Sequence, residues 1–170
     1  MGAHDGAFEA LKDGRLYMLL RTAWDRFWEA YSWDKGLSWR QIGPGPSTIP
    51  TSSSPGYMMR LASGRIALVW NSPLAGGKSR PLAEVLSELP PRKADLYYYA
   101  TSNPQMTRTE VSIAFSEDEG QTWTEPTLIK REPEGVAYFY MFEREPGLLW
   151  IKAAGGRLRV TIREEDLVGK

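Results

Sequence analysis

The sequence predicts an all-β fold, and three observations support this prediction. Short runs of β-branched and aromatic residues alternate with glycine-containing turn pairs along the 170 residues. The chain holds seven tryptophans, eight tyrosines, 16 glycines and 12 prolines, a composition typical of strands joined by tight turns. One eight-residue turn motif occurs twice. With 42% hydrophobic and 25% charged residues, the chain has the composition of a folded globular protein.

The predicted strands are short and are separated by turn residues. Asp13-Gly14 and Ser63-Gly64 stand between apolar runs, where glycine supplies the positive φ that a hairpin turn requires. Strands are expected over residues 15–22, 27–32, 57–61, 65–71, 96–100, 110–116, 127–130, 137–142, 148–152 and 157–163.

One segment departs from this pattern and predicts a short helix. Proline suits the first helical turn, and Pro81 stands there, while Pro90 and Pro91 end the segment. One helical face would carry Leu82, Val85, Leu86 and Leu89. We interpret residues 72–107 as an insertion between strands, either a packed decoration or a lid over a binding site.

The repeated motif has the form S-x-D-x-G-x-[ST]-W, known as an Asp-box. Its copies are Ser32–Trp39 and Ser116–Trp123, whose first residues lie 84 positions apart. When most of the insertion is removed, the remaining distance is about one propeller blade, roughly 40–50 residues. The repeat therefore predicts a β-propeller.

The residue types of the motif suit a structural turn. An aspartate side chain can accept backbone N–H bonds within a tight turn, and glycine permits a left-handed backbone. The final tryptophan would pack back on the turn. We therefore assign a structural role, and no catalytic one, to Asp34, Gly36, Trp39, Asp118, Gly120 and Trp123.

The predicted domain, residues 1–170, is a partial propeller of about three four-stranded blades. The blades cover residues 1–48, residues 49–131 with the insertion, and residues 132–170, the last without its outer strand. A closed propeller needs about 4–8 blades, and three would leave two open sides. Either an N-terminal half of a longer chain is missing, or two chains form a homodimer that completes a six-bladed ring.

Composition excludes several classes of function. Lysine plus arginine equals aspartate plus glutamate at 21 each, so no overall field attracts nucleic acid or a membrane. There is no cysteine, and the single histidine is His4, so we expect neither a metal site nor a cofactor. Residues 1–10 lack the pattern of a signal peptide, and no apolar run predicts a membrane span. The sequence assigns no cell compartment.

Beyond the two turns, further motifs resemble the C-terminal half of bacterial sialidases (exo-α-sialidases, neuraminidases), over nearly the whole chain. They are Phe8-Glu9, Asp13-Gly14-Arg15-Leu16, Arg21-Thr22, Ser53-Ser54-Pro55, Ser63-Gly64-Arg65, Val69-Trp70-Asn71, Arg108-Thr109, Ala137-Tyr138 and Pro146-Gly147. The resemblance implies a six-bladed propeller that removes terminal sialic acid.

The resemblance also implies roles for individual residues. Arg21 and Arg108 resemble two of the family's three carboxylate-binding arginines, and Tyr138 resembles its nucleophile. Glu9 resembles the glutamate that activates the tyrosine. We expect Glu9 and Tyr138 on innermost strands of their blades. The third arginine and the acid/base aspartate come from the N-terminal half in this family, and this chain has no match for them.

These residue types suit the chemistry. Guanidinium groups bind a carboxylate through paired, charge-assisted hydrogen bonds. A neutral tyrosine approaches an anionic sugar without the repulsion that a carboxylate nucleophile would meet, and sialidases are the known tyrosine exception among glycosidases. A nearby glutamate can accept the phenolic proton.

The sequence therefore predicts a sialidase-like glycoside hydrolase domain that acts on a glycan substrate with retention. The first rival is a non-catalytic, lectin-like propeller, favoured because Glu9 stands one residue early relative to Asp13-Gly14. The second is a structural fragment without a site of its own, favoured by the missing arginine and aspartate.

Overall fold

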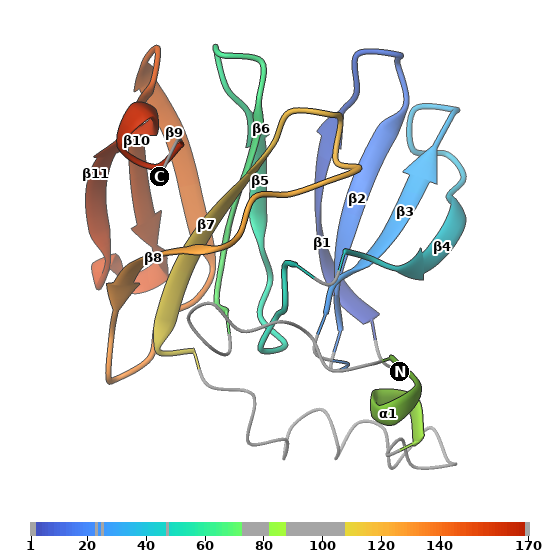
Figure 1. The fold of residues 1–170 in the computed structure, drawn as a ribbon, viewed down its shortest axis with the longest axis horizontal. Coiled ribbons are helices and arrows are strands. Elements are labelled where there is room, and N and C mark those ends of the chain that lie inside the picture. Colours follow the sequence, from blue (N-terminus) through green and yellow to red (C-terminus); the bar gives the residue numbers. More distant parts are fainter. Residues whose placement is uncertain are drawn as a thin grey trace.

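A computed structural model describes residues 3–22, 24, 26–46, 48–72, 82–87 and 108–168. Its strands form three antiparallel sheets that stand side by side, each with its strands in chain order (Figure 1). The prediction of an all-β chain arranged as part of a propeller is confirmed. The predicted strand at 96–100 and most of the 72–107 insertion lie outside the described residues.

The first sheet contains four strands that follow one another by short turns. The first hairpin turns at Gly14, whose φ is 88° and whose N–H donates to the Leu11 carbonyl at 3.0 Å. The strands are β1 (Ala3–Ala10), β2 (Leu16–Thr22), β3 (Trp28–Ser32) and β4 (Arg40–Pro44). We did not predict a strand at β4, because its largely exposed residues do not alternate between apolar and polar.

The second sheet also has four strands, with the insertion between its second and third. β6 reads as a continuous apolar run, and all five of its residues are buried between the neighbouring sheets. The strands are β5 (Tyr57–Arg60), β6 (Ile66–Trp70), β7 (Glu110–Ser116) and β8 (Thr127–Arg131). The predicted short helix is present as α1 (Leu82–Ser87).

The third sheet has three strands, β9 (Phe139–Glu145), β10 (Leu148–Ala153) and β11 (Arg159–Arg163). Short 3-10 turns follow β10 and β11 at η1 (Ala154–Gly156) and η2 (Glu164–Asp166). A strand was predicted from residue 137, but β9 begins at Phe139. Tyr138 has φ 57°, a left-handed conformation that no strand accommodates, so Tyr138 precedes the innermost strand rather than lying on it.

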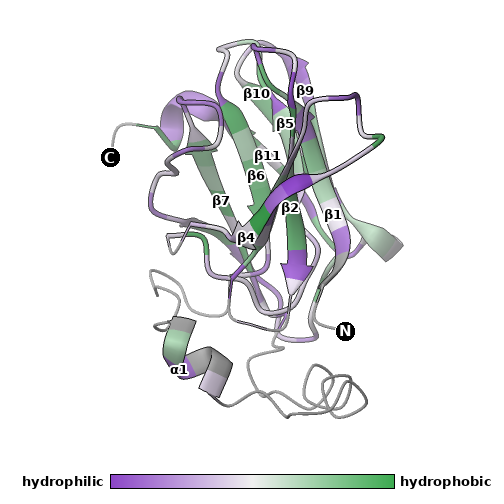
Figure 2. Ribbon diagram, turned by 90° about the vertical axis from the view of Figure 1, so that its right-hand side faces the viewer, coloured by the Kyte–Doolittle hydropathy of each residue, from purple (hydrophilic) through white to green (hydrophobic). Residues whose placement is uncertain are grey.

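Two apolar cores hold the sheets together, and apolar residues concentrate on the strands (Figure 2). Between the first and second sheets lie Tyr17, Leu19, Ile66, Leu68 and Trp70, each 0% exposed. The residues between the second and third sheets include Val69, Ile113, Met141, Leu149 and Ile151. Because the second sheet is buried on both faces, it fixes the arrangement of its neighbours.

The sheets have two ends. The hairpins at residues 11–15, 61–65 and 145–148 and both Asp-box turns lie at one end, the upper end in Figure 1, which we call the turn end. The first residues of β1, β5 and β9 lie at the other, which we call the start end.

Candidate functional site

Arg21 lies at the start end of the first sheet. It is close to the last residue of β2, opposite His4 of β1. Its side chain is 14% exposed, and its Nη1 donates to Asp5 Oδ2 at 3.1 Å. Its Nε is buried without a hydrogen-bond partner. The guanidinium therefore keeps unused donor capacity at this end of the sheet.

Arg108 and Tyr138 meet at the start end of the other two sheets. Arg108 comes just before β7, and its Cζ lies 5.7 Å from the centroid of the Tyr138 ring. Its Nη2 donates weakly to the Ser53 carbonyl at 3.4 Å. The backbone holds this pair in place, because Val136 N donates to the Arg108 carbonyl at 2.8 Å and Ala154 N to the Tyr138 carbonyl at 3.0 Å.

An open hollow of about 490 Å³ surrounds this pair. Tyr138 has a left-handed backbone, and the residue is 48% exposed at the edge of the hollow. Positive φ in a bulky residue costs about 1–2 kcal/mol, and such conformations concentrate at functional sites. The lining residues are Arg108, Glu134, Gly135, Val136, Ala137, Tyr138, Ala154 and Arg157.

Glu9 does not join these residues. It pairs with Tyr17 near the turn end of β1, whereas Arg21 pairs with His4 at the start end. Five residues of strand separate the two positions, a distance of about 16 Å. Glu9 Oε2 accepts the Arg60 N–H at 2.8 Å, at the junction with the second sheet. The structure therefore places Glu9 and Tyr138 at opposite ends of the sheets.

Two other carboxylates lie at the start end, and the sequence analysis missed both. Asp5 pairs with Arg21, and Glu134 lines the hollow beside Tyr138. Counting residues outward from the Ala10–Leu16 pair would have found Asp5, because the count places position 21 opposite position 5, one residue from its actual partner His4. No comparable signal marks Glu134, which lies in a loop.

Buried polar atoms without hydrogen-bond partners gather at the start end. Most buried polar atoms in native proteins are paired, so these unpaired atoms are unusual. In the described part of the chain these atoms include Arg21 Nε, Trp24 Nε1, Trp28 Nε1, Glu110 Oε2 and Ser112 Oγ.

The Asp-box residues lie at the turn end. Asp34 Oδ1 accepts the Ser38 N–H and Asp118 Oδ1 accepts the Thr122 N–H, each at 2.8 Å. Gly36 has φ 89° and Gly120 has φ 86°. Trp123 is 6% exposed, and its Nε1 donates to the Gly120 carbonyl at 3.2 Å, while Trp39 is half-buried.

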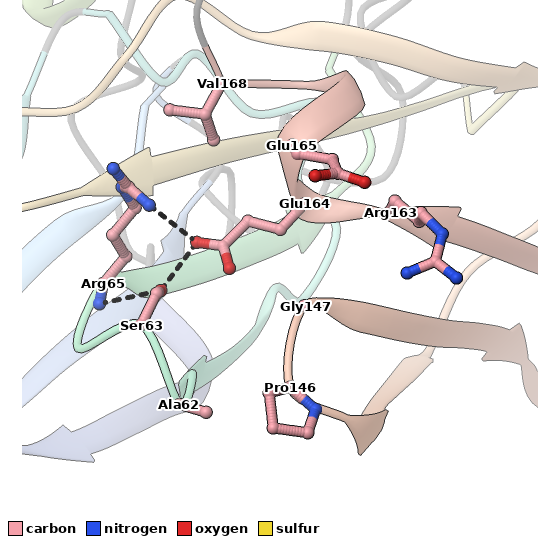
Figure 3. A pocket seen from close by; sticks show the side chains of 9 residues that line it. All are labelled: Ala62, Ser63, Arg65, Pro146, Gly147, Arg163, Glu164, Glu165 and Val168. Carbon is pink, nitrogen blue, oxygen red and sulfur yellow. Dashed lines mark hydrogen bonds and ion pairs between the residues drawn. The ribbon is translucent and has the colours of Figure 1, made fainter.

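A second cavity, of about 540 Å³, lies at the turn end between the second and third sheets (Figure 3). The buried Glu164 points toward Ser63 and Arg65, accepting from Ser63 Oγ at 2.6 Å and from Arg65 Nη1 at 3.1 Å. Because these contacts join two sheets and occupy the carboxylate, we interpret them as a structural junction.

Within the described residues, no group of three or more histidine, cysteine, aspartate or glutamate side chains is arranged to hold a metal ion. No helix among those residues is long and apolar enough to cross a membrane.

The fold and the repeated turns define a class, the β-propellers built from Asp-box blades. The chain belongs to the family described as "BNR repeat-like domain", whose model matches residues 7–151. A search of curated proteins found no match.

Solved structures are similar to this chain at low sequence identity, and those with a TM-score of 0.50 or more share its fold. The GH43 protein BlXynB from Bacillus licheniformis has a TM-score of 0.59 and 14% identity, covering 99% of this chain and 31% of that one. A protein of unknown function from Dyadobacter fermentans has a TM-score of 0.50 and 14% identity, with 96% and 38% covered. A Hadza microbial sialidase has a TM-score of 0.42 and 16% identity, with 97% and 33% covered. The present chain thus spans about a third of the length of these proteins.

Proposed function

We propose that this chain is the sialidase-like part of a glycoside hydrolase that releases terminal sialic acid, or a related acidic sugar, with retention. The observation that carries the proposal is the Arg108 guanidinium beside the Tyr138 phenol, 5.7 Å away in an open hollow. Arg21 lies at the same end of the sheets, with an unpaired Nε. A cation next to an exposed phenol suits both carboxylate binding and nucleophilic attack.

In this proposal the arginines bind the substrate and the tyrosine acts as the nucleophile. Arg21 and Arg108 bind the sugar carboxylate by charge-assisted hydrogen bonds. The Tyr138 oxygen attacks the anomeric carbon and gives its proton to a carboxylate base, which forms a tyrosyl-glycosyl intermediate. The aglycone oxygen leaves with a proton from the acid/base aspartate that the family carries in its N-terminal half. Water then gives a proton to that aspartate and attacks the same carbon, and the released tyrosine regains its proton from the base. The positive charge of Arg108 stabilises the phenolate as it develops and as it leaves.

A base must accept the phenolic proton, and Glu9 lies at the opposite end of the sheets from Tyr138. Glu134 lines the same hollow as Tyr138, and Asp5 lies at the start end on Arg21. We propose these two carboxylates as the candidates. Activity assays of Glu134→Gln and Asp5→Asn separate them, because only loss of the base flattens the acidic limb of the pH profile of kcat.

The test of the proposed reaction is hydrolysis of a fluorogenic sialoside. We expect Tyr138→Phe to lower kcat by more than about 10³-fold, because the nucleophile is lost. Tyr31→Phe is the matched control, since it removes a hydroxyl from a half-buried tyrosine on β3 and should retain activity. Full activity of Tyr138→Phe would exclude its role as the nucleophile.

A glycan-binding function without catalysis is the second candidate. One observation favours it: among the described residues no carboxylate accepts a hydrogen bond from the Tyr138 hydroxyl. Calorimetric titration of a sialoside separates the candidates, since binding without hydrolysis supports a lectin-like module. Arg21→Ala should weaken binding while Arg40→Ala, on the exposed β4, should not. Unchanged affinity in Arg21→Ala would remove Arg21 from the site.

A further inference from the structure

The third sheet exposes aromatic side chains on the face opposite its core with the second sheet. Phe142 and Trp150 are 61% and 44% exposed, and Tyr140, 52% exposed, lies at the edge of this face, where its ring centroid is 6.1 Å from that of Tyr57 on β5. Phe142 pairs with Trp150 and Tyr140 with Lys152, so the four side chains form one patch, which we call the third free face. Single exposed apolar residues are ordinary, but a contiguous patch marks an interaction surface.

The first sheet exposes an apolar face on its side away from the second sheet. Phe8 is 60% exposed and pairs with Met18. Leu16 and Leu20, which lie on the same face of β2 as Met18, are partly exposed. We call these four residues the first free face. Within the part of the chain that the structure describes, an apolar face therefore remains uncovered at each side of the row of sheets.

The second sheet shows what covers such faces. The three hairpins that turn at Gly14, Gly64 and Gly147 align the sheets residue by residue. The pair Phe8–Met18 is then equivalent to Met58–Leu68, which packs on the first sheet.

The same alignment assigns the third free face. The pair Phe142–Trp150 is equivalent to Met59–Ala67, which packs against the third sheet. The third free face therefore corresponds to the face on which a blade packs against the blade that follows it. The first free face corresponds to the face on which a blade packs against the blade that precedes it. The two free faces are thus the two sides of one type of contact between neighbouring blades.

The junction inside the chain shows that the equivalent strands come close to each other, because the equivalent of position 142 contacts the equivalent of position 10. Glu9 occupies the position of Phe142, and Met58 occupies the position of Phe8. Glu9 Oε2 accepts the Arg60 N–H at 2.8 Å, two residues from Met58. Positions 142 and 8 should accordingly approach each other when a third free face packs on a first free face.

We propose that the third free face of one copy packs on the first free face of a second copy, so that two chains close into a six-bladed ring. A closed propeller needs about 4–8 blades, and two copies of three blades fall within this range. The two-fold arrangement covers both faces of both copies at once, as closed symmetric oligomers do. Formation of the dimer is independent of the proposed catalytic function, and measuring the molar mass of the chain requires no enzymatic activity.

Light scattering after gel filtration tests the proposal on the whole chain. The expected mass of the wild type is twice 19.2 kDa. Phe142→Glu should yield a 19.2 kDa monomer, because it places a charge in the contact. Leu37→Glu is the matched control, since Leu37 is 89% exposed on the first Asp-box turn, and it should remain dimeric. A monomeric wild type, or a dimeric Phe142→Glu variant, would overturn the proposal.

A mixing experiment tests the head-to-tail arrangement and guards against misfolding of the variant. Phe8→Lys alone should also be monomeric. A mixture of Phe8→Lys and Phe142→Glu chains can form one wild-type contact and one Lys–Glu contact, so we expect a heterodimer at the summed mass. Circular dichroism establishes that each variant is folded. Folded variants that stay monomeric when mixed would contradict the proposed contact.

Discussion

The two Asp-box turns have the same internal bonds but different surroundings. In each, the first serine donates to the aspartate Oδ1, at 2.8 Å in Ser32–Trp39 and 2.9 Å in Ser116–Trp123. In each, the glycine N–H donates to that serine oxygen at 2.8 Å. The residue before the glycine has φ 59° at Lys35 and 62° at Glu119. The motif alone therefore determines the backbone of the turn.

Only the second turn is built into a junction between sheets. Gly120 lies so close to the buried Tyr17 that an added Cβ would come within 2.6 Å of its ring. Glu119 accepts the N–H of Lys12, in the hairpin of the first sheet, at 2.9 Å, and it accepts from both Nη atoms of Arg60, on its own sheet, at 2.9 and 2.7 Å. In the first turn Lys35 is exposed, and a Cβ at Gly36 would meet Leu16 at an ordinary 3.6 Å. The two copies of the motif should therefore contribute different amounts to the free energy of unfolding.

The largest expected effect comes from comparing Gly120→Ala with Gly36→Ala. Both place a side chain at positive φ, at a cost of about 1–2 kcal/mol. Only Gly120→Ala also overpacks a core residue, at a further cost of about 1–3 kcal/mol. Urea denaturation should therefore show a clearly larger loss for Gly120→Ala. Equal losses would mean that Tyr17 moves aside and that the junction is not tightly packed.

A smaller effect is expected from the residue before each glycine. Glu119→Gln weakens the partly buried contacts with Arg60 on the same sheet and with Lys12 on the first sheet, and we expect a loss of about 1–2 kcal/mol in the free energy of unfolding. Lys35→Gln is the matched control at the equivalent exposed position and should stay within about 0.5 kcal/mol. If both substitutions were neutral, Glu119 would not couple the first two sheets.

The smallest effect concerns the aspartates and pH. Hydrogen bonds from the Ser38 side chain and backbone lower the pKa of Asp34 from 3.8 to about 2. At Asp118 burial favours the neutral acid, but hydrogen bonds from Thr122 and Ser116 outweigh it, so the pKa is also lowered. A carboxyl group whose pKa is lower in the folded state than in the unfolded state stabilises the fold when the pH is above its pKa in the unfolded state. This stabilisation is lost as the pH falls through the pKa of the folded state.

The stability difference between the wild type and Asp34→Asn should therefore be constant above pH 3.8 and shrink as the pH falls to about 2. Denaturation curves at several pH values measure this difference, and an NMR titration of the Asp34 carboxyl group gives the pKa directly. A carboxyl pKa near 3.8 would mean that the turn bonds do not persist in solution.

Much of the fold was predictable because its signals are local. The Asp13-Gly14 and Ser63-Gly64 hairpins, the continuous apolar run of β6 and the two Asp-box turns each depend on residues close in sequence. β4 was missed, since an exposed outer strand carries no alternation of apolar and polar residues. The start of β9 was misplaced because nothing in the residues around Tyr138 signals its left-handed backbone.

The candidate site was less predictable. Arg21, Arg108 and Tyr138 all lie at the start end, Arg21 on β2 and the other two just before β7 and β9, while Glu9 lies at the turn end. Whether a residue falls at one end of a strand or the other depends on pairing register, and an offset of a few residues carries a side chain about 10–16 Å. Glu134 enters the hollow through a loop, where sequence periodicity gives no information.

By itself the sequence determined the strands, the turns and the assignment of residues to sheet faces, because alternation and turn chemistry act between near neighbours. Only the tertiary structure decided which turn lies in a junction, which carboxylates accompany Arg21 and Tyr138, and which apolar faces remain uncovered. These properties arise from contacts between sheets far apart in the chain, such as Gly120 on Tyr17. Burial against such distant neighbours sets the strength of an interaction, and no local pattern encodes it.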